Sequence, residues 1–211
     1  MHSERNKGYR SGYASVNGLR MYYKIHGTGR PLVLLHGSLT TIDTSFGKLL
    51  PSLSETGQVI SMEQQGHGRT ADTDRPLTYE QMAEDTTELL RQLRIEKADF
   101  FGYSMGSAVA MQIAKEQQLT REFKGWKPDE IQAIKPPAFI ITCDSDVVRP
   151  EHVIEIFRLL GGGVAGDLTG LPRSRLAMLP GTTHVTMAER ADWLLPMIKE
   201  FLNVPVPEGN D

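Results

Sequence analysis

A serine inside a Gly-x-Ser-x-Gly pentapeptide is the feature of this sequence with the clearest chemical meaning. The pentapeptide runs from Gly102 to Gly106 and has Ser104 at its centre. A short apolar run ends at Phe101, and residues 105–114 follow with apolar side chains on nearly every side, as in a helix packed on a sheet. A strand, this pentapeptide and a helix in succession form a sharp turn that exposes a serine hydroxyl. We therefore predict that Ser104 is a nucleophile held in a strained backbone conformation.

A serine hydroxyl becomes a good nucleophile only when a base, usually a histidine, removes its proton. Two histidines follow Ser104 in the chain. His152 lies inside a predicted helix, where we expect it at the surface. His184 lies in a loop just past the last predicted strand. We therefore expect His184 to be the base.

An acid must hold the base histidine in the right tautomer, and in this chain order the acid lies between the serine and the histidine. The segment Cys143-Asp144-Ser145-Asp146 follows the penultimate predicted strand and offers two candidates. Asp144 comes earlier, where it could accept neighbouring backbone N–H groups as a turn residue. Asp146 lies further along, towards the histidine loop, and we prefer Asp146.

The negative charge that develops during acyl transfer needs two N–H groups aimed at one point. The N–H of Met105, directly after the nucleophile, is one candidate. The N–H of Ser38, in the turn after an apolar run at 31–35, is the other. For His36 and His67 we expect structural roles in loop packing.

Several elements must position these residues. Short apolar or alternating runs predict strands at residues 12–17, 19–25, 31–35, 58–62, 98–102, 138–142 and 175–179. Helical patterns follow at residues 45–53, 78–93, 105–117 and 150–160, and near Asp192. The dipeptide Asn17-Gly18 predicts a two-residue antiparallel hairpin, and Thr78 begins a capping box.

The alternation of strands and helices predicts an α/β fold: a mostly parallel sheet with helices on both faces and an N-terminal antiparallel hairpin. Such sheets place their chemistry in loops at the carboxyl ends of the strands. Ser38, Ser104, Asp146 and His184 each follow a predicted strand.

Length and composition set further expectations. The 211 residues predict a single domain over 1–211, with flexible tails at 1–11 and 204–211. The net charge is −3 and the sequence has no basic stripe, so we expect no nucleic-acid partner. Cys143 is the sole cysteine, which excludes an internal disulfide and favours a reducing, cytoplasmic compartment. A polar N-terminal segment predicts no signal peptide, and no apolar run reaches the ~18 residues of a membrane span.

Known cofactor motifs are absent from the sequence. No cluster of His, Cys, Asp or Glu has the spacing of metal ligands, and neither a dinucleotide fingerprint nor a P-loop occurs. The Gly-rich tract at 161–172 follows a helix, so we expect a loop there. We therefore expect no cofactor and no metal.

The ordered motifs together resemble those of the α/β-hydrolase fold superfamily, in its serine hydrolase branch, over about residues 12–203. The residues that carry the resemblance are His36-Gly37-Ser38, Gly66-His67-Gly68-Arg69-Thr70, Gly102-Tyr103-Ser104-Met105-Gly106, Cys143-Asp144-Ser145-Asp146 and Gly181-Thr182-Thr183-His184. The resemblance implies Ser104 as nucleophile, Asp146 as acid and His184 as base. Serine at the elbow speaks against haloalkane dehalogenase or epoxide hydrolase activity, because those relatives carry aspartate there.

The chain departs from the family between the nucleophile and the acid. Relatives usually place another strand and a helical cap there, whereas only residues 105–145 separate the two positions here. Residues 121–126 look like the tail of a cap whose body is largely absent. We therefore expect the strand at 138–142 to pair directly with that at 98–102, and the site to be shallow and open.

These observations predict a cofactor-free serine hydrolase that cleaves a small carboxylic ester through an acyl-enzyme. Two alternatives stay open. The chain is a catalytically impaired or truncated member that acts as a binding protein, or it is a hydrolase of a carbon–carbon or amide bond. The oligomeric state is left undetermined by the sequence.

Overall fold

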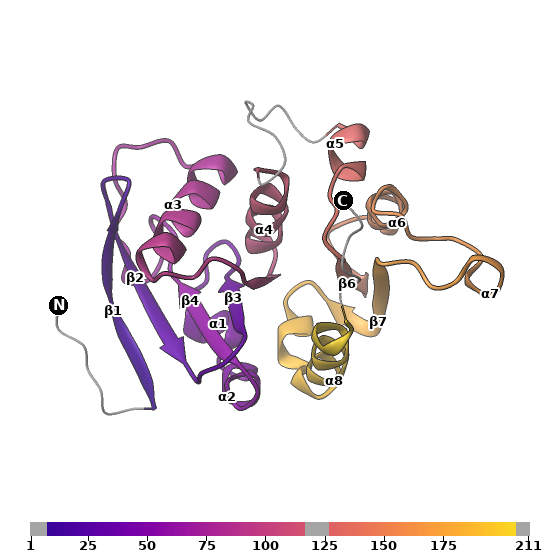
Figure 1. The fold of residues 1–211 in the computed structure, drawn as a ribbon, viewed down its shortest axis with the longest axis horizontal. Coiled ribbons are helices and arrows are strands. Elements are labelled where there is room, and N and C mark those ends of the chain that lie inside the picture. Colours follow the sequence, from indigo (N-terminus) through magenta and orange to yellow (C-terminus); the bar gives the residue numbers. More distant parts are fainter. Residues whose placement is uncertain (1–7, 117–126, 206–211) are drawn as a thin grey trace. The chain divides into compact units, whose positions relative to one another are not determined.

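The structure is a computed structural model that describes residues 8–116 and 127–205 (Figure 1). The chain forms two compact units, Met1–Ile113 and Ala114–Asp211, called unit 1 and unit 2 below. The single domain predicted over 1–211 stays a prediction. Within the described ranges, no helix is long and apolar enough to cross a membrane.

Unit 1 is built on a five-stranded sheet with the order β1-β2-β4-β3-β5 (Figure 1). Its strands are β1 (Tyr9–Val16), β2 (Leu19–His26), β3 (Pro31–Leu35), β4 (Gln58–Met62) and β5 (Asp99–Gly102). β1 pairs antiparallel with β2, and β2 pairs antiparallel with β4. β3 lies parallel between β4 and β5. The carboxyl ends of β3, β4 and β5 therefore meet at one edge of the sheet.

The hairpin between β1 and β2 confirms the predicted two-residue turn. Asn17 has a φ of 46° and Gly18 a φ of 84°. Two-residue hairpin turns of type I′ require such positive φ angles at both central residues. The Asn17 side chain donates to Asp85 at 2.9 Å, which ties the turn to the helix behind it. β1 begins at Tyr9, so residues 9–11 belong to the sheet, and the predicted flexible tail over 1–11 is wrong there. Their backbone pairs with residues 24–26 of β2.

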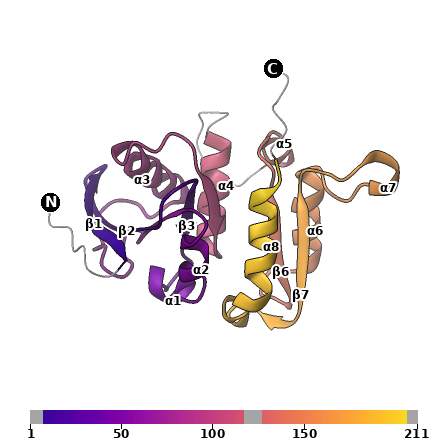
Figure 2. The same ribbon diagram turned by 60° about the horizontal axis from the view of Figure 1, so that its bottom comes forward.

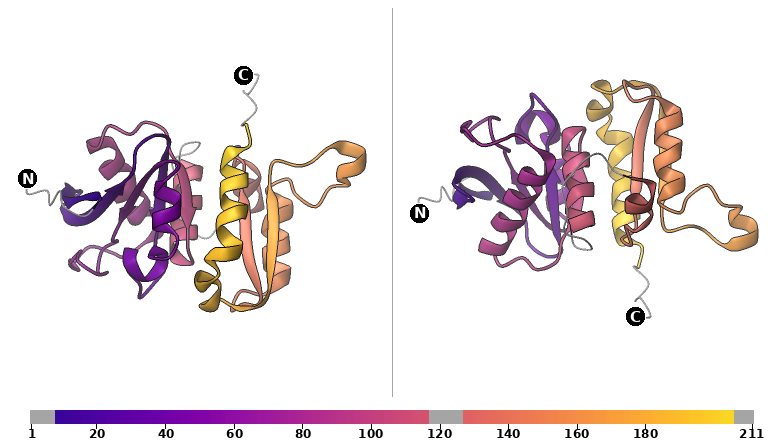
Figure 3. Two further views of the ribbon diagram at one scale, coloured as in Figure 1. Left: turned by 90° about the horizontal axis from the view of Figure 1, so that it is seen from below. Right: turned by 90° about the horizontal axis from the view of Figure 1, so that it is seen from above.

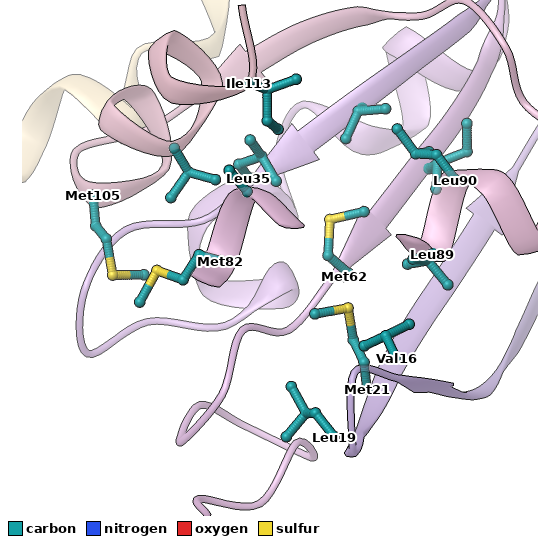
Figure 4. Close-up of a cluster of buried hydrophobic side chains, with 14 of the residues drawn as sticks. Val16, Leu19, Met21, Leu35, Met62, Met82, Leu89, Leu90, Met105 and Ile113 are labelled. Carbon is teal, nitrogen blue, oxygen red and sulfur yellow. The ribbon is translucent and has the colours of Figure 1, made fainter. Parts of the chain in front are cut away.

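Helices cover both faces of this sheet, as predicted (Figure 2). They are α1 (Ile42–Phe46), α2 (Leu50–Ser54), α3 (Tyr79–Gln92) and α4 (Met105–Glu116). α3 and α4 pack on one face, where Met82, Leu89 and Leu90 meet Leu35 and Met62 of the sheet (Figure 4). α1 contacts β3 and α2 contacts β4, and Figure 2 shows both on the opposite face. β3 is thus buried from both sides, which explains its continuous apolar sequence.

Two helix predictions need correction in detail. The single helix predicted over 45–53 is two short helices, because α1 ends at the cap residue Gly47 and Pro51 lies in the first turn of α2. Thr78 caps α3 by accepting the N–H of Gln81 at 3.1 Å, as predicted. The last helix, predicted to begin near Asp192, begins at Ala191.

Unit 2 contains a two-stranded parallel sheet, β6 (Phe139–Ser145) and β7 (Arg175–Thr183). Its helices are α5 (Pro128–Gln132), α6 (Pro150–Leu159), α7 (Gly166–Thr169), the 3-10 helix η1 (Thr186–Glu189) and α8 (Ala191–Asn203). α6 and α8 flank the two strands in Figures 2 and 3. The ring of Phe139 packs 5.4 Å from that of Phe201, which holds α8 on the sheet.

The predicted pairing of the 138–142 strand with the 98–102 strand would join the two units and stays a prediction. Within the described residues β6 pairs with β7, and β5 pairs with β3. β7 extends to Thr183 and offers β6 a long parallel ladder inside its own unit. The segment 121–126, interpreted from the sequence as the tail of a cap, lies outside the described residues.

Candidate active site

Ser104 lies on the turn between β5 and α4, with a φ of 52°. A non-glycine residue rarely adopts this conformation, and such strain persists only where the surroundings impose it. A Cβ at Gly102 would overlap the carbonyl of Gly106, and a Cβ at Gly106 would overlap the carbonyl of Leu35. Strand and helix therefore approach so closely that both positions require glycine. The predicted strained turn at Ser104 is confirmed.

The loop after β3 lies directly against this turn. A side chain at Gly37 would meet the Tyr103 ring at 2.9 Å and the Cβ of Ser104 at 3.2 Å. The Tyr103 N–H donates to the Leu35 carbonyl at 2.9 Å, at the point where the loop leaves β3. Unit 1 therefore brings the loop that carries Ser38 next to Ser104 and Met105, the residues named as nucleophile and oxyanion donors.

His36 pins this loop, as the sequence predicted. Its ring is fully buried. Nδ1 lies 2.8 Å from the Gly37 carbonyl, and Nε2 accepts the Gln64 N–H at 3.0 Å. These two contacts assign the neutral tautomer with the proton on Nδ1. Burial is the main cause of a lowered pKa for His36, which favours the neutral ring.

His67 also has the packing role expected of it. Its ring lies 5.0 Å from the ring of His36, and its Nδ1 lies 2.8 Å from the Gln65 carbonyl. Both contacts stay within the loops that leave β3 and β4. His152, which the sequence analysis did not favour as the base, is a surface residue beside Glu155.

Asp146 and His184 form a hydrogen-bonded pair in unit 2. Asp146 Oδ1 lies 2.9 Å from His184 Nδ1, and the two side chains are 4% and 23% exposed. Asp146 also accepts the Val148 N–H at 3.1 Å. Burial by itself would raise the pKa of Asp146, but Val148 N–H and His184 outweigh it and the pKa is lowered. The carboxylate is therefore ionised and holds the ring by Nδ1, which leaves Nε2 as the nitrogen that a triad would use as base.

Asp144 contacts the same loop by a different route. Its carboxylate accepts the Gly181 N–H at 2.8 Å and the Thr182 N–H at 3.3 Å. The Gly181 N–H is the main cause of a lowered pKa for Asp144. Asp144 therefore clamps the histidine loop by its backbone, whereas Asp146 contacts the His184 ring itself.

A buried charge network in unit 1 was missed by the sequence analysis. Glu63, at the end of β4, is fully buried and pairs with Arg69. Arg69 also reaches Asp43 at 3.1 Å, and Asp43 binds Lys24 at 2.6 Å. The one signal available in the sequence was Glu63 itself, a charged residue directly after the apolar run 58–62. The other members of the network follow no regular spacing in the sequence.

In the part of the chain that the structure describes, no group of three His, Cys, Asp or Glu side chains could hold a metal ion. The predicted site residues thus form two groups. Unit 1 holds Ser104 with the proposed oxyanion donors at Ser38 and Met105. Unit 2 holds the Asp146–His184 pair.

Part of the chain is similar in sequence to known enzymes. The chain is 32% identical over 101 residues to pyrrolizixenacetamide deacetylase of Xenorhabdus hominickii, covering 48% of this chain and 38% of that protein. It is 40% identical over 93 residues to sn-1-specific diacylglycerol lipase ABHD11 of Danio rerio, covering 43% and 29%. The matches span less than two fifths of the length of these curated relatives.

Solved structures show the same fold at low sequence identity. A meta-cleavage product hydrolase from Pseudomonas fluorescens IP01 superimposes with a TM-score of 0.78 and 16% identity, covering 91% of this chain and 97% of that one. Carboxylesterase CesB from Bacillus subtilis has a TM-score of 0.75 and 12% identity, covering 98% and 93%. The model of the alpha/beta hydrolase fold matches residues 30–158, more than half of the chain. The chain therefore belongs to the alpha/beta hydrolase fold family.

Proposed function

We propose that this protein is a serine hydrolase that cleaves small carboxylic esters through Ser104, Asp146 and His184. The observation that carries the proposal is the turn at Ser104, where a non-glycine residue has a φ of 52° between two closely packed glycines. The Asp146–His184 hydrogen bond of 2.9 Å supports it from unit 2. Similarity to a deacetylase and a lipase supports acyl transfer as the reaction class.

In the first half of the reaction, Ser104 Oγ attacks the ester carbonyl carbon while His184 Nε2 takes the hydroxyl proton. Asp146 keeps the His184 ring in the tautomer with Nδ1 protonated and stabilises the imidazolium that forms. The carbonyl oxygen becomes an oxyanion, which the N–H groups of Ser38 and Met105 would stabilise. The bond to the leaving alcohol then breaks, and His184 gives its proton to that alcohol.

In the second half, water attacks the acyl group on Ser104 and His184 again takes the proton. The bond between Ser104 Oγ and the acyl carbon breaks, the carboxylic acid leaves, and His184 returns the proton to Ser104. The cycle needs no cofactor, since proton transfers and one oxyanion site account for each step. It requires Ser104 Oγ and His184 Nε2 to meet during the reaction.

A second candidate reaction is amide hydrolysis, which the 32% identity to a deacetylase favours. The same residues would act, with His184 protonating a leaving amine. Parallel assays with p-nitrophenyl acetate and p-nitroacetanilide separate the two reactions by the bond that is cut.

The direct test is to trap the acyl-enzyme. The protein is mixed with p-nitrophenyl acetate, quenched in acid and digested, and mass spectrometry locates the acetyl group. We expect the acetyl group on the peptide that contains Ser104, and no acetylation of that peptide in Ser104→Ala. Turnover that continues unchanged in Ser104→Ala would overturn the nucleophile assignment, and a folded protein without any acylation would favour a binding role.

A further inference from the structure

We infer that Glu63 and Arg69 are positioning residues for the oxyanion loop, defined as residues 36–41. The inference rests on the proposed function, because Ser38 in this loop is the proposed oxyanion donor. It concerns residues of unit 1 alone, and each contact that carries it lies between the segments that leave β3 and β4.

The segment after β4 holds the oxyanion loop at both ends. At the first end, the Gln64 N–H donates to His36 Nε2 at 3.0 Å. At the second end, Glu63 pairs with Arg69, and Arg69 Nη2 reaches Asp43 in the first turn of α1 at 3.1 Å. The segment after β4 therefore contacts both the start of the oxyanion loop and the helix into which the loop runs.

Arg69 keeps the Glu63 carboxylate charged and correctly oriented. Its backbone N–H and its Nε donate to Glu63 Oε2 at 2.6 and 2.9 Å, and its Nη2 binds Oε1. Burial by itself would raise the pKa of Glu63, but the hydrogen bonds from Arg69 outweigh it and the pKa is lowered. The carboxylate stays ionised at neutral pH and keeps the Arg69 guanidinium in place.

The same guanidinium reaches the helix that follows the loop. Arg69 Nη2 lies 3.1 Å from Asp43 Oδ2, and Lys24 Nζ lies 2.6 Å from Asp43 Oδ1. The Arg69 guanidinium also stacks on the Tyr22 ring, 4.0 Å from its centroid. The first turn of α1 is therefore held by charge from β2 and from the loop after β4.

The oxyanion loop needs this external support because its own conformation is strained. Leu39 has a φ of 58°, and its side chain is 98% exposed, so packing of that side chain does not stabilise the turn. Inside the loop, Thr40 Oγ1 donates to the Gly37 carbonyl at 2.8 Å. A strained turn persists only where its surroundings over-determine it, and here the surroundings are the contacts at its two ends.

Removing one partner of a buried ion pair leaves an uncompensated charge and destabilises the local structure. We therefore expect that loss of the Glu63 charge releases the second end of the loop and moves the Ser38 N–H. Misplacing a single oxyanion donor slows acyl transfer by about 10²–10³-fold in other enzymes.

Unit 1 offers a matched control for general destabilisation. Asp85 is nearly fully buried and pairs with Arg75, whose Nη2 lies 2.7 Å from Asp85 Oδ2. This pair ties the hairpin turn at Asn17 to α3. Asp85→Asn therefore removes a buried carboxylate of the same kind without removing a contact of the oxyanion loop.

The experiment compares wild type, Glu63→Gln and Asp85→Asn by hydrogen exchange and by acetylation with p-nitrophenyl acetate. We expect Glu63→Gln to speed exchange in peptides covering residues 36–46 by at least tenfold, and to slow acetylation of Ser104 by about 10²-fold with little change in KM. Asp85→Asn should leave both quantities within about threefold of wild type, although it lowers the melting temperature. If Glu63→Gln does not fold, Arg69→Lys replaces it, since this variant keeps the charge and loses the fork geometry.

Unchanged exchange over 36–46 in a folded Glu63→Gln, or an equal effect of Asp85→Asn, would overturn the positioning role. The proposed function fails in a different way: wild type that never acetylates Ser104 contradicts the reaction. The exchange comparison still decides whether Glu63 holds the loop.

Discussion

The two aspartates at the end of β6 contact the segment 181–184 at different points, and this difference gives a prediction at the scale of single residues. Asp146 contacts His184 Nδ1, whereas Asp144 accepts the N–H groups of Gly181 and Thr182. Asp146→Asn should lower kcat by about 10⁴-fold, since an amide favours the wrong tautomer. Asp144→Asn should lower the melting temperature and change kcat only a few-fold.

Steady-state kinetics and thermal melting of both variants check this prediction. Comparable losses of kcat in the two variants, with unchanged melting, would contradict the assignment of Asp146 as the acid.

His36 gives a prediction on the pH dependence of stability. Burial lowers its pKa below the ordinary value of 6.5, so the unfolded chain binds a proton more readily than the folded one as the pH falls below that value. The free energy of unfolding should therefore decrease as the pH is lowered from about 6.5, because stability rises with pH wherever the unfolded state binds more protons.

The measurement is urea unfolding between about pH 5 and 8, with His36→Gln as the comparison. His26 also has a pKa lowered by burial, so the contribution of His36 is the difference between the two proteins. Identical pH slopes in wild type and variant would contradict a buried neutral His36.

At the scale of elements, the close approach of α4 to the end of β3 decides whether the turn at Ser104 forms. A Cβ at Gly106 would overlap the Leu35 carbonyl, and a backbone cannot move away as a flexible side chain can. Gly106→Ala should therefore cost about 3 kcal/mol or more, at the upper end of overpacking effects. At Gly161 a Cβ meets no atom within 4 Å and only the φ of 86° is unfavourable, so Gly161→Ala should cost about 1–2 kcal/mol.

Denaturant unfolding of the two variants gives these values. A Gly106→Ala variant as stable as Gly161→Ala would show that strand and helix are not in the close contact described.

Local signals were sufficient to predict most elements and several contacts. Asn17-Gly18 predicted the hairpin, and the two glycines around Ser104 predicted its strained turn, because each conformation depends on residues next to one another. His36 was expected to pin its loop for the same reason. The pattern of apolar residues over 45–53 did not show that Gly47 and Pro51 divide the segment into two helices.

Contacts between distant segments were predicted less well. The Glu63–Arg69 network escaped notice because a charged residue in a loop is normally solvated, and only the fold buries it. Asp144 was interpreted as a local turn residue, although the N–H groups that it accepts belong to Gly181 and Thr182 at the end of β7.

At the scale of the whole molecule, the length of chain between nucleophile and acid leads to a prediction on substrates. Residues 105–145 include α4, α5 and β6, so little chain remains to build walls around a long acyl group. We expect kcat/KM to be highest for p-nitrophenyl acetate and to fall for butyrate and octanoate esters. Kinetics with this ester series, below the micelle-forming concentrations, check the trend, and a maximum at octanoate would contradict a shallow site.

The central claim is that Ser104 is a nucleophile activated by His184, and covalent labelling with a fluorophosphonate probe tests it most directly. The probe forms a bond only with an activated serine, and mass spectrometry of the digested protein locates that bond. Wild type should be labelled on Ser104, His184→Ala should be labelled far more slowly, and Ser104→Ala should not be labelled, with near-equal melting curves for all three. Labelling that persists in Ser104→Ala, or folded wild type that is never labelled, would contradict the claim.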